Sequence, residues 1–191
     1  MSNVKVLVFS GSIRKGSFNK QLAAVAAQSA GAEAEVTLLD LADFPMPIYD
    51  GDLEAAEGLP TNAKKLRRLF DEHDAFIIAS PEYNGFFSPL LKNTLDWVSR
   101  SDADEPDLVP YKGKVAALLA ASPGGLGGLR ALPSLRQLLS GIGVLVIPDQ
   151  LAIGGAMSVF DGEGQLKDDS WQPKIDGVVE ALMKTASALK S

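Results

Sequence analysis

The chain has 191 residues, of which 46% are hydrophobic and 22% are charged, a composition typical of one soluble globular domain. Its formal net charge of −6 argues against a general nucleic-acid or anionic-membrane surface, because such partners require a basic patch. The absence of cysteine excludes a disulfide framework, a thiol nucleophile and a thiolate metal site. We therefore expect a single domain over residues 1–191, with no nucleic-acid or membrane partner.

The first residues, MSNVKVLVFSGS, lack the basic start and the long apolar run of a signal peptide. No segment approaches the roughly 20 apolar residues that a membrane-spanning helix requires. These two observations predict a cytoplasmic location.

Five short apolar runs predict buried strands. They are rich in Val, Ile, Leu and Ala at consecutive positions, as expected of parallel strands that are covered on both faces. The predicted strands cover residues 4–10, 35–39, 75–80, 115–120 and 144–146, the last extending slightly further.

Helical patterns follow these runs. The first predicted helix starts at Ser17 or Asn19 and ends near residue 30, and the second starts at Thr61 or Asn62. The third starts at Ser88, with Pro89 in its first turn. The last two predicted helices cover residues 126–140 and 174–189. Pro133 is compatible with its helix only in the first turn or as a kink. Strands alternating with helices predict an α/β three-layer sandwich with a doubly wound parallel sheet. Segments 50–60 and 158–170 are predicted to be polar surface insertions.

The first strand is followed by a loop that can bind a phosphate. In SGSIRKGSFNKQL, residues 10–22, the hydroxyls of Ser12 and Ser17, the Asn19 amide and the Arg14 guanidinium accompany the N-terminus of a predicted helix. The alternative is a capped turn with exposed charges. The loop lacks the lysine of a P-loop and the spacing of a dinucleotide fingerprint, so a phosphate monoester fits better than a nucleoside triphosphate or a dinucleotide.

Two more loops follow the third and fourth predicted strands. SPEYNGFFSPLLKNTLDW, residues 80–97, offers aromatic rings and a tight turn at Asn84 and Gly85, which could read the edge of a heterocycle. Its alternative is a strand-to-helix turn with core aromatics. ASPGGLGGLRAL, residues 121–132, has four glycines that permit positive φ or close approach to a flat ligand. Ligands of open α/β sheets bind beyond the carboxyl ends of the strands, where these loops lie.

The strings GSIRKGSFN, PEYNGFFSPLLKNTLDW and SPGGLGG, in this order, resemble the NADPH-dependent FMN reductase family, which includes quinone and chromate reductases. The resemblance implies a flavodoxin-like fold with strand order 2-1-3-4-5 and noncovalently bound FMN. It also implies NADPH or NADH as co-substrate, and a homodimer or homotetramer in which a neighbouring subunit borders the flavin.

The resemblance also implies the site residues. The positions that match the family's phosphate loop are Ser12, Arg14, Ser17, Phe18 and Asn19. Those that match its loop along the isoalloxazine are Pro81, Glu82, Tyr83, Asn84 and Gly85. Those that match its third flavin loop are Ser122, Gly124 and Gly127. The extra glycines leave the register of the third set open. Arg14 has three candidate roles: binding the FMN phosphate, binding the 2′-phosphate of NADPH, or facing solvent. Glu82 is expected to meet a basic residue across a subunit boundary.

The function implied is hydride transfer from NAD(P)H to FMN and then electron transfer to a quinone, flavin, chromate or similar small acceptor. The cofactor carries this chemistry, so we expect no catalytic side chain and no metal. His73 and Asp96 are accordingly expected to be helix-end and helix-surface residues. The alternatives are a flavodoxin-type FMN electron carrier without pyridine-nucleotide activity and a nucleotide-binding regulatory module without flavin.

Overall fold

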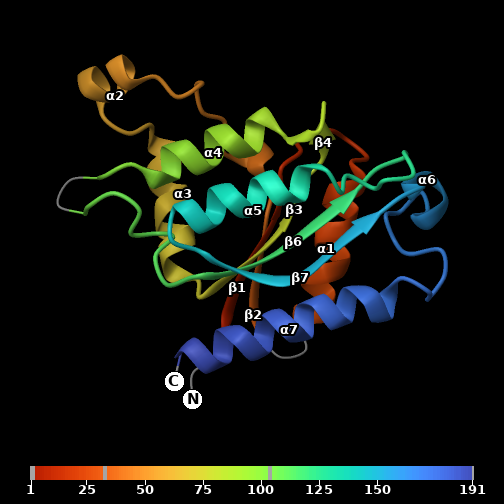
Figure 1. Ribbon diagram of the computed structural model, residues 1–191. Helices are drawn as coiled ribbons and strands as arrows, with labels where there is room; N and C mark the ends of the chain where they lie inside the picture. Colours follow the sequence, from red (N-terminus) through yellow and green to blue (C-terminus); the bar gives the residue numbers. More distant parts are fainter. Residues whose placement is uncertain (1–2, 32–33, 103–104, 191) are drawn as a thin grey trace.

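The computed structural model describes residues 3–31, 34–102 and 105–190, and in these ranges five parallel strands form one sheet (Figure 1). The order across the sheet is β2-β1-β3-β6-β7, which confirms the expected 2-1-3-4-5 topology. The strands are β1 (Lys5–Ser10), β2 (Glu35–Leu39), β3 (Ala75–Ala79), β6 (Val115–Ala121) and β7 (Leu145–Ile153). Each of the first four lies within a residue or two of its predicted range.

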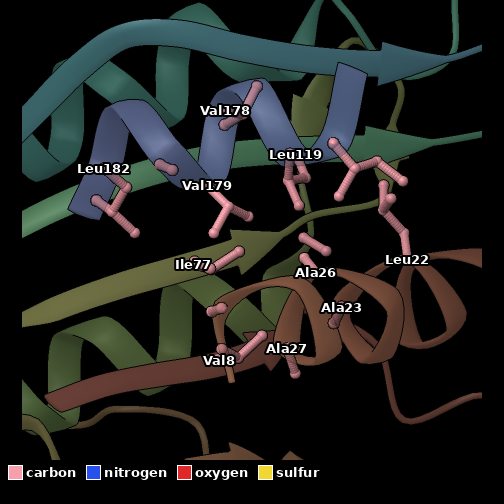
Figure 2. Close-up of a cluster of buried hydrophobic side chains, with 14 of the residues drawn as sticks. Val8, Leu22, Ala23, Ala26, Ala27, Ile77, Leu119, Val178, Val179 and Leu182 are labelled. Atoms are coloured by element: carbon pink, nitrogen blue, oxygen red, sulfur yellow. The ribbon is translucent and has the colours of Figure 1, made fainter. Parts of the chain in front are cut away.

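Helices cover both faces of the sheet and complete the three layers (Figure 1). One face carries α1 (Phe18–Ala30) and α7 (Gln172–Lys190), and the other carries α3 (Thr61–Glu72), α4 (Pro89–Ser99) and α5 (Ala131–Gly141). Figure 2 shows Val8, Ile77 and Leu119, from three neighbouring strands, among side chains of α1 and α7. Both faces of each central strand are therefore buried, which explains the continuous apolar runs.

The helix predicted over residues 126–140 begins later, at Ala131. Gly127 and Gly128 have φ of +64° and +90°, which right-handed helical backbone does not allow, so residues 122–130 form turns. Pro133 consequently lies in the first turn of α5, where its missing N–H leaves no hydrogen bond unmade.

The fifth strand continues to Ile153, beyond Pro148, and is irregular opposite β6 between Ala116 and Leu118. The guanidinium of Arg136, on α5, donates hydrogen bonds to the carbonyls of Val146 and Ile147 at 3.0 and 2.7 Å. These bonds satisfy backbone groups that the irregular pairing leaves available.

One of the two predictions about the insertions is corrected. Segment 50–60 contains a short helix, α2 (Gly51–Glu57), which stands away from the sheet and is capped by the Asp50 carboxylate (Figure 1). Segment 158–170 is not simply polar surface, because Val159, the last residue of the short helix α6 (Ala156–Val159), and Phe160, which follows it, are buried. Phe160 stacks on Phe18 with ring centroids 6.2 Å apart. The apolar pair anchors an otherwise polar segment to α1.

His73 also differs from expectation. It follows the end of α3, as predicted, but it is only 5% exposed rather than at the surface. Its Nε2 lies 2.8 Å from the Thr37 hydroxyl, and its Nδ1 lies within hydrogen-bond distance of the Leu69 carbonyl. Asp96 is partly exposed and forms an ion pair with Lys92 on the same helix, as expected for a helix-surface residue.

In the described ranges no helix is long and apolar enough to cross a membrane.

Asp74 joins the two ends of the described chain. Its carboxylate accepts hydrogen bonds from the Lys5 backbone N–H at 2.8 Å and from Lys190 Nζ at 2.6 Å. Burial raises the pKa of Asp74, but the bonds from Lys190 and Lys5 outweigh burial and hold that pKa below its usual value. The ionised carboxylate therefore stabilises the folded state.

We expect Asp74→Asn to destabilise the protein at pH 7, and we expect the difference from wild type to shrink as pH falls. A carboxylate with a depressed folded-state pKa contributes its full stability above the unfolded value of about 3.9 and loses it as pH falls through the lower folded value. Urea unfolding between pH 7 and pH 3 measures the effect. Asp71→Asn, an exposed acid on α3, is the matched control, and a difference for Asp74→Asn that is constant with pH would contradict the assignment.

Candidate functional site

Three loops follow the carboxyl ends of adjacent strands and lie together at that end of the sheet (Figure 1). They follow β1, β3 and β6 and cover residues 11–17, 80–88 and 122–130. The Gly11 N–H donates to the Ala79 carbonyl at 2.9 Å, and the Ser88 hydroxyl donates to the Gly11 carbonyl at 2.6 Å. The predicted loops are therefore brought together by the strand order and by direct hydrogen bonds.

The first loop ends in a helix start that is open to a ligand. Ser17 is the N-cap of α1 with extended backbone angles, and among the described residues no side chain caps this helix. Gly16 has φ +65°, which turns the loop toward the helix. The Ser12 hydroxyl accepts from the Arg14 backbone N–H at 3.3 Å, and both serines are buried. Uncapped first-turn N–H groups with hydroxyls beside them form an anion-binding site.

Arg14 is exposed and lies along its own loop. Its guanidinium donates to the carbonyls of Lys15 and Gly16, each at 3.2 Å. A guanidinium has five N–H donors, so donors remain for an anion next to the loop.

Asn19 has a different role from a phosphate donor. Its side chain is 3% exposed, and its amide exchanges two hydrogen bonds with the backbone of Ala121, both 2.9 Å long. The backbone N–H of Asn19, in the first turn of α1, makes none of these bonds and is available to a ligand. The ring of Phe18 packs on Phe160, so Phe18 also faces the site through its backbone alone.

The second loop is a β-hairpin rather than a simple strand-to-helix turn. Strands β4 (Glu82–Tyr83) and β5 (Phe86–Phe87) pair antiparallel around Asn84 and Gly85, whose φ angles of 54° and 82° define a type I′ turn. The predicted tight turn is thus confirmed. Phe87 is buried in the core, whereas Tyr83 and Phe86 are about half exposed at the site.

Two of the four glycines in the third loop, Gly127 and Gly128, accommodate the chain itself. A Cβ atom at Gly127 would lie 2.5 to 2.7 Å from backbone atoms of Ile153 and Gly154, so only glycine fits there. The Ser122 N–H donates to the Ile153 carbonyl at 3.0 Å. Gly124 differs, since its added Cβ would meet only the Ser122 hydroxyl, at 3.7 Å. The loop is fixed to the end of β7 and presents Gly124 outward.

Glu82 meets a basic residue of its own chain. Its nearly buried carboxylate accepts from Arg130 Nε at 2.7 Å and from the Arg130 backbone N–H at 3.1 Å. This ion pair joins the hairpin to the start of α5. Sequence reasoning missed Arg130, because 48 residues separate it from Glu82 and no local pattern marks it.

Comparison with known proteins agrees with this geometry. The family model for NADPH-dependent FMN reductase matches residues 4–158. The chain is 36% identical over 182 residues to an NAD(P)H-dependent FMN reductase of Pseudomonas aeruginosa, covering 94% of each chain. It is also 36% identical to a quinone reductase of Escherichia coli, covering 94% of this chain and 93% of the relative. The solved structure of FerB, a flavoenzyme NAD(P)H:(acceptor) oxidoreductase from Paracoccus denitrificans, superposes with a TM-score of 0.81 at 26% identity, covering 97% of this chain and 98% of that one.

The chain therefore belongs to the NADPH-dependent FMN reductase family, a family of flavin-dependent enzymes. Its parallel sheet and strand order are those expected from the family resemblance.

We expect Asn19→Ala to destabilise the protein by about 1 to 3 kcal/mol, because it leaves the backbone N–H and C=O of Ala121 without their buried partners. The measurement is the free energy of unfolding in urea. Gln28→Ala, an exposed change on the same helix, is the matched control and should stay within about 0.5 kcal/mol of wild type. Equal stabilities for the two variants would show that the Asn19 amide is dispensable.

Proposed function

We propose that the protein is a single-domain, FMN-containing oxidoreductase that takes hydride from NADPH or NADH and reduces a small acceptor. The observation that supports it best is the uncapped N-terminus of α1, set at the same sheet edge as the Tyr83 hairpin and the third loop. The free N–H groups of the helix N-terminus suit a phosphate, and the hairpin and the third loop suit a flat heterocycle.

The residues present fit FMN. The phosphate would be held by the hydroxyls of Ser12 and Ser17, by Arg14, and by the backbone N–H groups of Phe18 and Asn19. The two sets that would border the isoalloxazine are Pro81, Glu82, Tyr83, Asn84 and Gly85 on the hairpin, and Ser122, Gly124 and Gly127 on the third loop. Bound FMN would supply the redox chemistry by accepting hydride from the nicotinamide and passing electrons to the acceptor.

The side chains of the site bind and orient rather than react. In the described part of the chain no cluster of His, Asp or Glu could hold a metal ion. The protein's single histidine, His73, is buried between α3 and β2, so it is not placed as a proton donor at the site. The carboxylate of Glu82 is neutralised by Arg130, which keeps an uncompensated negative charge away from the flavin loops.

We propose a quinone as the first acceptor to test, because a quinone reductase is among the relatives of this chain. Free flavins and chromate are further acceptors. An open flavin face accepts such small oxidants because electron transfer requires close approach more than specific contacts.

We further propose that the protein is a cytoplasmic homodimer or homotetramer. Side chains that are about half exposed or more surround the carboxyl edge of the sheet: Ile13, Tyr83, Phe86, Leu126, Leu129 and Met157. Such apolar side chains on one face are typical of a surface that a second subunit covers.

The test is an absorption spectrum of the protein after incubation with FMN and desalting, followed by anaerobic NADPH or NADH. Retained yellow flavin that bleaches on addition is the expected result, and reoxidation by a quinone completes the cycle. Flavin that is retained but stays oxidised would instead identify an electron carrier. Failure to retain flavin would overturn the proposal.

We expect Arg14→Ala to weaken FMN binding about 10- to 150-fold, since a charge-assisted hydrogen bond to phosphate contributes about 1.5 to 3 kcal/mol. Fluorescence titration with FMN measures this change. Lys15→Ala removes a neighbouring exposed charge and should have a smaller effect. An unchanged FMN affinity in Arg14→Ala would assign Arg14 to the 2′-phosphate of NADPH or to solvent.

A further inference from the structure

A pocket of about 190 Å³ lies beside the phosphate loop, between the carboxyl ends of β1 and β2 and the first turns of α1. It is lined by Ser10, Ser12, Lys20, Ala23, Leu38, Leu39 and Asp40. Ser10 is 4% exposed, and its hydroxyl has no hydrogen-bond partner among the residues that the structure describes. Because an unpaired buried hydroxyl is costly, its presence indicates that this pocket receives a polar group.

The lining of the pocket includes an ion pair. Lys20, the third residue of α1, donates from Nζ to the carboxylate of Asp40, which follows the end of β2. The other carboxylate oxygen of Asp40 accepts from the Ala42 N–H at 3.0 Å. Burial raises the pKa of Asp40, but the bonds from Lys20 and Ala42 outweigh it and hold that pKa below its usual value. The Asp40 carboxylate is therefore ionised at neutral pH.

This ammonium lies next to the predicted phosphate site. Lys20 is in the first turn of α1, three residues after its N-cap, Ser17. Ser12 belongs to the phosphate loop and also lines the pocket, so the two share a wall. The Lys20 side chain is 34% exposed, and water and salt screen a partly buried charge less than an exposed one such as that of Arg14.

A further positive charge beside Arg14 would stabilise a bound phosphate monoester. The monoester carries about −1.5 to −2 at pH 7, while a helix N-terminus contributes an equivalent of about +0.5. Lys20 is the nearest further cation on α1, but Asp40 cancels part of its charge.

Building on the proposed FMN binding, we propose that Lys20 is a further phosphate-binding residue and that Asp40 is a positioning residue that limits its strength. Asp40 holds the ammonium beside the pocket, and its negative charge opposes the incoming phosphate. The hydroxyls of Ser10 and Ser12 supply hydrogen bonds on the same side. The pair thus sets how tightly the protein keeps its flavin.

The proposal predicts opposite effects for the two partners. Lys20→Met leaves the Asp40 charge uncompensated near the phosphate, so FMN binding should weaken about three- to tenfold. Asp40→Asn keeps the size of the side chain and one oxygen acceptor, replaces the other oxygen with an NH2 group and removes the negative charge, so FMN binding should tighten by a similar factor. The double variant should return close to wild type. Lys20→Arg, which keeps the charge, should bind FMN nearly as wild type does.

The test is to titrate each variant with FMN and with riboflavin, which lacks the phosphate. The expected result is that FMN affinity moves in the two directions while riboflavin affinity does not change. Lys184→Met on α7, which removes one positive charge elsewhere, is the control for net charge and should leave both affinities unchanged.

Four results would overturn the proposal. If FMN and riboflavin affinities move together, the pair acts on the shape of the site and not on the phosphate. If Asp40→Asn weakens FMN binding, or if all variants bind FMN as wild type does, Lys20 is not a phosphate ligand. A wild-type protein that binds neither flavin would overturn the proposed function itself, and this inference with it.

Discussion

The two hydrogen bonds between the Asn19 amide and the backbone of Ala121 set the geometry of the ligand edge. Ala121 is the last residue of β6 and pairs with Ile153 of β7 on one side. On its other side β3 has already ended at Ala79, so a buried N–H and C=O require other partners. Asn19 supplies both from the start of α1. The phosphate loop, the helix start and the third loop are thereby held as one unit.

The same arrangement explains why polar groups gather where the sheet ends. Five parallel strands with helices on both faces leave unpaired backbone groups at the strand ends and along the outer sides of the two edge strands, β2 and β7. At the carboxyl ends of the strands the chain satisfies some of these groups with Asn19 and Ser88 and leaves the first N–H groups of α1 without a side-chain cap in the described structure. An anion that binds there recovers the missing hydrogen bonds, so binding and local stability are linked.

Several features followed from short stretches of sequence. The apolar runs predicted the strands because a strand buried on both faces must be apolar at consecutive positions, and Asn84 with Gly85 predicted the turn because both tolerate positive φ. The family strings predicted the strand order. Helix α2 was not predicted, although its cap, Asp50, immediately precedes it. The burial of Phe160 and of His73 was missed, because in both cases a distant element covers the residue.

The sequence by itself determined the layers of this protein, its ligand-binding loops and the residue types available there, since these depend on local periodicity and turn chemistry. Only the tertiary structure decided how the long polar side chains are used. Asn19 bonds Ala121 across 102 residues, Glu82 meets Arg130 across 48, and Lys20 meets Asp40 across 20. Each pair forms because the fold places the end of one element beside the start of another. The number of residues between two partners does not determine how far apart they lie in space.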